Sequence, residues 1–169
     1  MNSLLTLQPI DRIRRNHGLE HATIHVLSSR LRGVGMAGRS TPGGFYIYGN
    51  VPTDALGEAA QEALGRMKNG EHYLAVHPGC GTNFVTAGVF AAAAAFLALL
   101  GGGRSVRSRI GRLPAAMLAT TVALVLSQPA GFAVQEHITT SGEPGTMEIV
   151  AVRLLSRRPV TTHRVDTRG

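Results

Sequence analysis

The sequence predicts an α+β fold that is interrupted by an inserted pair of apolar helices. Two blocks of the 169-residue chain contain no Asp, Glu, Lys or Arg: residues 72–103 and residues 113–135. Outside these blocks, segments with a helical apolar period alternate with short runs rich in β-branched residues. The formal net charge is +7, and there is one cysteine. This pattern argues against a wholly soluble domain, and it excludes a disordered tail protein and a disulfide-stabilised scaffold.

Each charge-free block contains a segment that is long enough to cross a membrane. Residues 84–100 are nearly all apolar and, with their uncharged flanks, match a hydrocarbon core of about 30 Å. Residues 113–134 form the second segment, with Pro114 at a favourable helix start. Because only residues 101–112 connect the two apolar segments, we expect them to form a transmembrane helical hairpin. The lipid bilayer is then an expected partner of the chain. A pair of buried core helices in a soluble protein is the alternative interpretation.

Two observations bear on the orientation of this hairpin, and they conflict. The connecting segment carries four arginines, and basic loops tend to stay in the cytoplasm. Residues 1–83, however, contain no signal peptide that would export them. We give the second observation more weight and expect an inner (cytoplasmic) membrane protein with two spans and its polar domain on the cytoplasmic side.

The polar segments at the two ends, residues 1–83 and 135–169, predict one small domain that is split in sequence by the hairpin. Neither part alone is large enough for a secure core, so we expect them to fold together. Apolar spacing predicts helices, and turn residues between β-prone runs predict strands. The expected elements are a long helix over about 9–31, a hairpin around 41–44, a second helix within 51–70, a short strand over 72–76, and strands over 146–155 and 160–165.

Three histidines and a glutamate share one face of the first predicted helix. At 100° per residue, His21 lies 40° from His17 and His25 lies 80° from it, and Glu20 borders the same face. Apolar residues fall in the same stripe, so we expect this face to be buried. A buried polar group must be satisfied, and a metal ion satisfies several imidazoles at once. A histidine cluster held only by hydrogen bonds is the alternative.

The segment HPGCGTN, residues 77–83, offers the next potential ligands. A Pro-Gly turn lets His77 and Cys80 point at one spot. If both bind together with His17 and His21, four ligands close a structural zinc site, whereas three ligands and a water make a catalytic one. The alternative is a tight turn before a membrane helix, with Cys80 as a small buried apolar residue.

Other polar residues are expected around this site, either supporting the ligands or contacting a substrate. His137 follows the second span, and a hairpin topology returns it to the side of His77. A polar residue at position 128 interrupts an apolar run, although a place near lipid headgroups also explains it. His72 and His163 are expected at the surface. The four supporting residues are His25, Asn83, Gln128 and His137.

The segment HGLEH, residues 17–21, resembles the H-x-x-E-H motif of the inverzincin metallopeptidases. The resemblance implies that His17 and His21 bind Zn²⁺ and that Glu20 acts as the general base on a zinc-activated water. Gly18 is an unusual residue inside a helix.

A longer pattern also resembles a known family. The order HGLEHATIHVL, GRSTPGGFYIYGNVPT, HPGCGTN and HITT is similar to an uncharacterised family of small bacterial two-span membrane proteins, a domain of unknown function. The resemblance covers roughly residues 15–150. It implies that these segments form one unit, and it brings no activity with it.

These observations predict a membrane-bound metal-dependent hydrolase, most simply a compact zinc metallopeptidase with Glu20 as base at a His17/His21 site. The expected substrate is a peptide or membrane protein, and residues 44–48 could bind an extended peptide at a sheet edge. The alternative is a non-catalytic membrane metal-binding or complex-assembly protein with a structural His/Cys site, alone or as a homo-oligomer. Nucleic acid is not expected as a partner, because the basic residues are dispersed.

Overall fold

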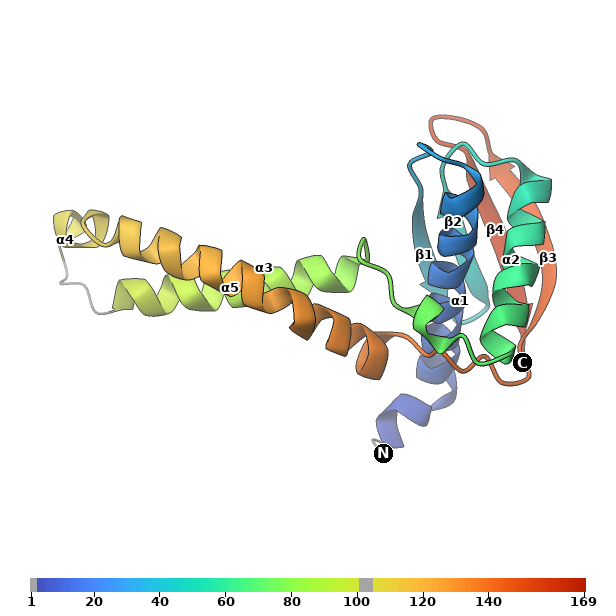
Figure 1. The fold of residues 1–169 in the computed structure, drawn as a ribbon, viewed down its shortest axis with the longest axis horizontal. Coiled ribbons are helices and arrows are strands. Elements are labelled where there is room, and N and C mark those ends of the chain that lie inside the picture. Colours follow the sequence, from blue (N-terminus) through green and yellow to red (C-terminus); the bar gives the residue numbers. More distant parts are fainter. Residues whose placement is uncertain (1–2, 101–104) are drawn as a thin grey trace. The chain divides into compact units, whose positions relative to one another are not determined.

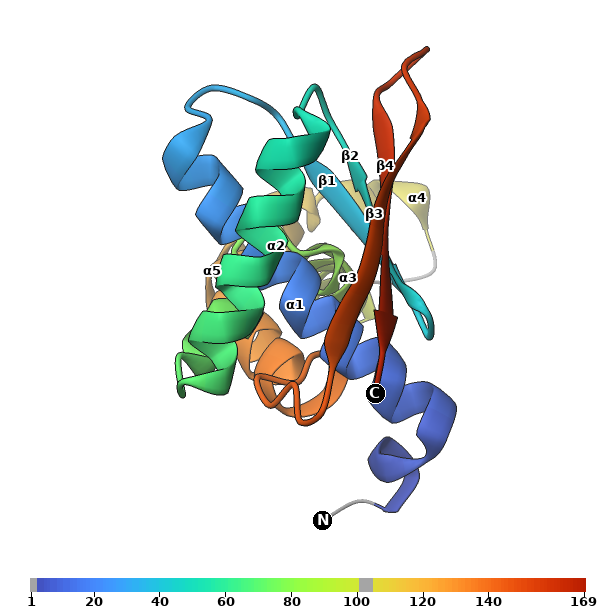
Figure 2. The ribbon, with the colours of Figure 1, turned by 90° about the vertical axis from the view of Figure 1, so that its right-hand side faces the viewer.

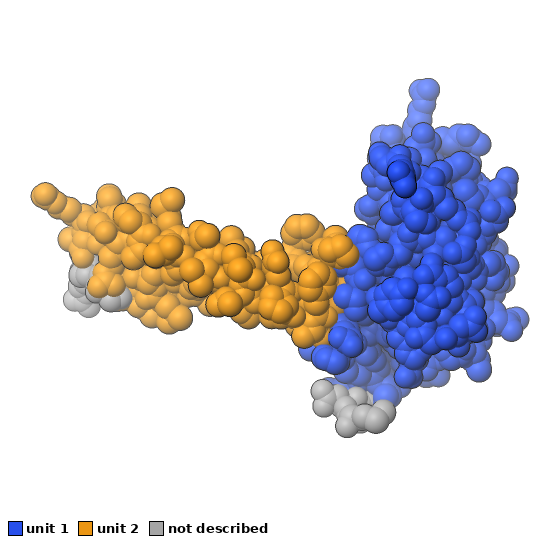
Figure 3. All heavy atoms as spheres, viewed as in Figure 1, with its two compact units in different colours: residues 1–77, 136–169 blue, residues 78–135 orange. Residues whose placement is uncertain are grey.

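The computed structural model describes residues 3–100 and 105–169, which fall into two compact units (Figure 3). Unit 1 comprises residues 1–77 and 136–169, and unit 2 comprises residues 78–135. Unit 1 contains η1 (Ser3–Thr6), α1 (Gln8–Arg30), β1 (Ala37–Thr41), β2 (Gly44–Tyr48), α2 (Thr53–Lys68), η2 (His72–Ala75), β3 (Glu148–Ser156) and β4 (Thr162–Arg168). Unit 2 contains α3 (Gly81–Leu100), α4 (Val106–Ile110) and α5 (Leu113–Val134), and a π-helical turn, η3 (Gln135–Thr139), follows α5.

Unit 1 is a two-layer α+β structure. Its four strands are antiparallel in the order β1-β2-β4-β3, and α1 and α2 lie side by side on one face of the sheet (Figure 2). Phe45 of β2 faces Val165 of β4, which faces Val152 of β3. The sheet therefore joins strands from both ends of the chain, as the sequence predicts. The largest fully buried apolar side chains are Leu19, Leu27, Phe45, Ile47, Leu56 and Met67.

Three local predictions are wrong. The segment expected as a strand over 72–76 contains the 3₁₀ turn η2 (His72–Ala75) instead, because it packs against α1 and pairs with none of the strands in the described part of the chain. Strand β2 is paired on both sides, with β1 and β4, so it offers no free edge for an extended peptide. His163 is buried instead of exposed, because it shares the inner face of β4 with Val165, and it hydrogen-bonds with the Thr53 hydroxyl.

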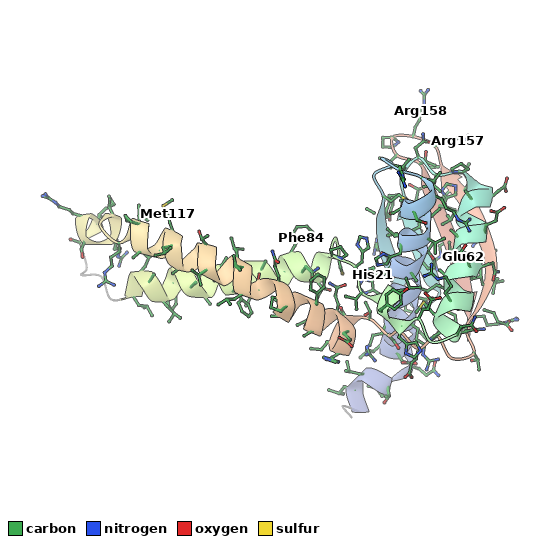
Figure 4. The ribbon with its side chains drawn as sticks, viewed as in Figure 1. His21, Glu62, Phe84, Met117, Arg157 and Arg158 are labelled. Atoms are coloured by element: carbon green, nitrogen blue, oxygen red, sulfur yellow. The ribbon has the colours of Figure 1, made fainter. Side chains whose placement is uncertain are left out.

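Unit 2 consists mainly of α3 and α5, which pack along each other (Figure 1). Both helices are long and apolar enough to cross a membrane. No residue of α3 is buried, and large apolar side chains such as Phe84 and Met117 are 72% and 69% exposed (Figure 4). Of the loop arginines, Arg107, Arg109 and Arg112 lie in and beside α4, and Arg104 falls outside the described residues.

Candidate metal centre

Three of the histidines are carried by α1, which Asn16 ties to strands β1 and β4. The side-chain amide of Asn16, which is 1% exposed, donates to the carbonyl oxygen of Thr41 at 2.9 Å. Its oxygen accepts a hydrogen bond from the Thr167 hydroxyl at 2.7 Å. A buried amide with both ends satisfied fixes the position of its helix. The neighbouring histidines are therefore presented on a rigid element.

Gly18, the unusual residue of the HGLEH segment, lies where another segment crosses α1 closely. A Cβ atom at this position would overlap the backbone carbonyl oxygen of Ser141 and would lie 3.2 Å from the Cβ of Ala75. The Ser141 amide also donates to the Arg14 carbonyl oxygen at 3.0 Å. The glycine therefore permits the chain after α5 to pack directly on α1, beside His17.

His17 and His21 are both oriented by backbone carbonyl groups. The Nδ1 atom of His17 lies 2.9 Å from the Thr139 carbonyl oxygen, and that of His21 lies 2.7 Å from the Ala75 carbonyl oxygen. Because a carbonyl oxygen only accepts, each Nδ1 carries the hydrogen, and the lone pair of the neutral ring is on Nε2. This backbone contact is the arrangement commonly seen behind metal-binding histidines. The ring centroids are 4.4 Å apart.

Two further histidines extend this pair into a cluster of four. The ring of His77 lies 5.8 Å from that of His21 and 4.8 Å from that of His25, measured between centroids. His25 donates from Nε2 to the Val76 carbonyl oxygen at 3.0 Å. Burial, together with a smaller contribution from the nearby rings of His25 and His21, lowers the pKa of His77 to about 4. His77 is therefore neutral at pH 7, which is the form that binds metals.

Glu20 faces strand β1. The side chain is 4% exposed, and its carboxylate accepts a hydrogen bond from the Ser40 hydroxyl. A Cβ atom on Gly38 would overlap this carboxylate, so the strand can pass over Glu20 only with glycine there. The sequence analysis did not predict the contacts of Gly38 and Ser40 with Glu20. The available signal was the two-residue period of a strand, which puts positions 38 and 40 on the same face of β1, the face that packs on α1.

The ring contacts of the described histidines join His17, His21, His25 and His77, and they do not include His137. His137 lines a polar hollow of about 900 Å³ in unit 1 together with His72 and Tyr73. Arg14, another residue that the sequence reasoning missed, holds the backbone here. Its guanidinium donates to the carbonyl oxygens of Ile138 at 2.8 Å and Thr140 at 3.0 Å.

Three predicted site residues, Cys80, Asn83 and Gln128, belong to unit 2. Asn83, in the first turn of α3, accepts a hydrogen bond from the Gln135 side-chain amide at 2.7 Å and donates to the Pro78 carbonyl oxygen at 2.9 Å. Gln128 lines an apolar pocket of about 470 Å³ between α3 and α5. The amide of Thr82 lies 3.4 Å from the Cys80 sulfur, which stabilises negative charge on that atom.

His17 and His21 offer two imidazole nitrogens that could hold a metal ion. Imidazole suits zinc, and copper, iron and nickel also accept it. The ligand atoms of His17 and His21 are no more than 4.8 Å apart. Tetrahedral zinc places its nitrogen ligands about 3.4 Å apart, which lies within this limit.

Comparison with known proteins places the chain in a family. Residues 12–152 match a domain of unknown function, DUF6391. The chain belongs to this family. An uncharacterised protein from Picosynechococcus sp. is 33% identical over 143 residues, which cover 76% of this chain and 66% of that protein. The chain thus spans about two thirds of that relative's length. None of the solved structures matches.

The family assignment covers the elements that carry the site, from the first half of α1 to β3. It agrees with the prediction that these segments belong together in one domain of unknown function. It brings no activity, and the inverzincin resemblance still rests on the HGLEH segment alone.

Proposed function

We propose that this protein is a membrane-anchored, metal-dependent hydrolase whose metal, expected to be zinc, binds between His17 and His21. One observation carries the metal site: both rings present Nδ1 to a backbone carbonyl oxygen and so direct their lone pairs from Nε2. Two imidazoles one helical turn apart on a rigid helix span one edge of a tetrahedral site.

His77 and Cys80 are the proposed further ligands. His77 is in ring contact distance of His21, within the same unit. Cys80 follows it by three residues, so the chain keeps the two Cα atoms within about 11 Å. If both bind, the site is closed and structural. If one does not, a water molecule completes the coordination and the site is open for catalysis.

Glu20 is the proposed general base, and its position next to His21 in α1 supports this role. A bound zinc ion supplies Lewis-acid chemistry to water and to a substrate carbonyl group. Glu20 takes a proton from the attacking water as its oxygen bonds to the peptide carbonyl carbon. The same carboxyl group then gives the proton to the departing amine as the C–N bond breaks. Ser40 orients the carboxylate from the opposite side.

A non-catalytic metal protein is the second proposed function, and the surroundings of Glu20 favour it. The carboxylate packs on Gly38 and accepts from Ser40, so it already has a structural role in joining β1 to α1. In that case the metal stabilises unit 1 as part of a membrane complex or homo-oligomer.

Membrane anchoring by α3 and α5 is part of the same proposal. Both helices pass the length and hydropathy requirements for a span. We propose an inner-membrane location with unit 1 on the cytoplasmic side, and the lipid bilayer and a peptide or membrane-protein substrate as partners. That nucleic acid is not a partner stays a prediction from the sequence.

The deciding experiment measures zinc bound to the purified full chain in detergent micelles. We expect about one equivalent, lost in His17→Ala and His21→Ala and kept in His72→Ala, a control at an exposed histidine outside the cluster. Wild-type protein without a stoichiometric metal would overturn both proposed functions. Loss of metal in the His72 control alone would overturn the ligand assignment.

Catalysis is then tested by Glu20→Gln, with cleavage of a peptide library read by mass spectrometry. We expect this variant to keep its metal and lose cleavage, whereas Glu62→Gln on the outer surface of α2 (Figure 4) keeps both. Unchanged cleavage in Glu20→Gln would contradict the base assignment. A metal-loaded wild type that cleaves nothing would leave the structural function as the supported one.

A further inference from the structure

An apolar stripe runs along the start of unit 1 on residues that the fold does not need for its core. Leu4 and Leu7 are 67% and 51% exposed, and Ile10 and Ile13 are each 38% exposed. We call these four side chains the N-terminal stripe. Ile10 and Ile13 are three residues apart in α1 and lie within 60° of each other around the helix, and Leu4 and Leu7 lie in and directly after the 3₁₀ turn η1 that leads into α1.

The stripe lies on η1 and the first turns of α1, which project from the rest of unit 1. The first turns of α1, with η1, extend beyond the sheet and beyond α2 (Figure 2). The buried residues of α1 begin only at Asn16. The stripe therefore lacks a covering layer among the described residues of unit 1.

Chain connectivity ties this part of α1 to the end of the second apolar helix. Arg14 donates to the carbonyl oxygens of Ile138 and Thr140. Ile138 follows Val134, the last residue of α5, by four residues, which span at most about 14 Å of chain. Ile10 lies one helical turn before Arg14, on the same side of α1. If α5 spans a membrane, this short connection leaves the stripe within reach of the bilayer surface.

The surroundings of the stripe have the composition of a membrane-facing surface. Tyr73 and Ile138 are 66% and 50% exposed, and tyrosine is enriched at the membrane–water boundary. Tyr73 lines the same hollow as Arg14, which places η2 beside the first turns of α1. Between residues 11 and 15, three arginines and one aspartate give a net charge of +2. Basic residues beside an apolar helix face favour anionic lipid.

We propose that the N-terminal stripe inserts into the headgroup layer of the bilayer, so that η1 and the first turns of α1 form an interfacial membrane anchor. The proposal rests on the membrane anchoring of α3 and α5 and is independent of the metal. Its partner is a lipid surface with anionic headgroups. Because His17 follows Ile13 by four residues on the same helix, this anchor holds the proposed metal site next to the bilayer surface. A substrate for that site is then a polypeptide segment next to a membrane span.

The absence of tryptophan from the chain makes this anchor directly measurable. Ile10→Trp places one fluorophore in the stripe. Val150→Trp, at a position that is 58% exposed on the edge strand β3 of the same unit, is the matched control. Each full-length variant is reconstituted into vesicles of phosphatidylcholine and phosphatidylglycerol, with and without bromine on the acyl chains. Leu7→Trp repeats the measurement if Ile10→Trp does not fold.

We expect brominated lipid to quench the stripe tryptophan at least threefold more strongly than the Val150→Trp control. Equal quenching at the two positions would overturn the proposal and would assign the stripe to a protein partner. Vesicle flotation separates this failure from that of the membrane hypothesis. A chain that floats without selective quenching keeps its spans and lacks the interfacial anchor, whereas a chain that does not float lacks both. Zinc content, measured on the same samples, reports on the proposed function alone.

Discussion

Helices α1 and α3 have similar lengths and opposite patterns of burial. Polar side chains of α1 are buried, among them Asn16, Glu20 and Thr23. In α3 the residues are strongly apolar, and none of them is buried. Each buried polar group of α1 has a partner, such as the Leu19 carbonyl oxygen for the Thr23 hydroxyl. The apolar groups of α3 have no such protein surroundings.

The difference follows from what polar and apolar side chains require of their surroundings. A soluble protein rarely leaves a contiguous apolar surface as large as a whole helix in water. A polar group, conversely, is buried only where its hydrogen bonds are replaced. α1 therefore meets the requirements of a helix in a folded protein core, and α3 has the apolar, exposed side chains expected under the membrane anchoring proposed above. Matched substitutions in the two helices test this comparison.

The largest difference is expected between two leucine truncations. Leu19→Ala removes a fully buried side chain of α1 and should lower the free energy of unfolding of unit 1 by about 2–5 kcal/mol. Leu97→Ala, at a position that is 66% exposed in α3, leaves no cavity and should cost less than about 1 kcal/mol in micelles. Urea titration followed by circular dichroism measures both. Tyrosine fluorescence isolates unit 1, because Tyr46, Tyr48 and Tyr73 all belong to it.

Equal costs for the two leucines would contradict the comparison. They would mean that α3 is covered by protein, either as the core helix of a soluble assembly or inside a homo-oligomer. Sedimentation of the wild type in the same detergent tells these two cases apart.

The glycines of the two helices provide the next pair. Gly18→Ala places a methyl group on the Ser141 carbonyl oxygen, so we expect unit 1 to lose about 1–3 kcal/mol of stability. Gly88 of α3 has open space around its Cα, and Gly88→Ala should be neutral or stabilising by up to about 1 kcal/mol. Thermal unfolding in micelles measures both changes. A neutral Gly18→Ala would show that the segment around Ser141 does not cross α1 as closely as described.

Much of the fold could be predicted because its signals are local. The charge-free blocks bound α3 and α5, and periodicity with turn residues located α1, α2 and both strand pairs. The strand expected at residues 72–76 failed because a strand needs a neighbour, which local sequence does not show. His163 was misplaced for a related reason: the face of β4 that turns inward depends on its register with β2 and β3.

The candidate site was predictable in part. The helical spacing of His17, His21 and His25 fixes their common face, and the structure adds His77 beside them. Contacts from distant segments could not be read from the sequence. Examples are the carbonyl oxygen of Thr139 behind His17 and the Ser40 hydroxyl on Glu20. The reason for Gly18 also required the tertiary structure, since the residue it accommodates is Ser141.

The smallest difference is expected between two asparagines with the same hydrogen-bonding pattern. Asn16 in α1 and Asn83 in α3 each donate to a carbonyl oxygen and accept from a side chain. Asn16→Ala leaves the Thr41 carbonyl oxygen and the Thr167 hydroxyl without this partner in a dry core, and it should cost about 1–3 kcal/mol. Asn83→Ala should cost about 0.6 kcal/mol, because a polar group in a membrane helix finds other partners when a bond is lost.

The exposed residue Asn50 supplies the control, since Asn50→Ala should leave stability within about 0.5 kcal/mol of wild type. Urea titration of the three variants in micelles orders them. An Asn83 variant as unstable as the Asn16 variant would place the first turn of α3 in a tightly packed protein interior. The boundary between the water-soluble and the lipid-exposed part of the chain would then lie beyond Asn83 along α3.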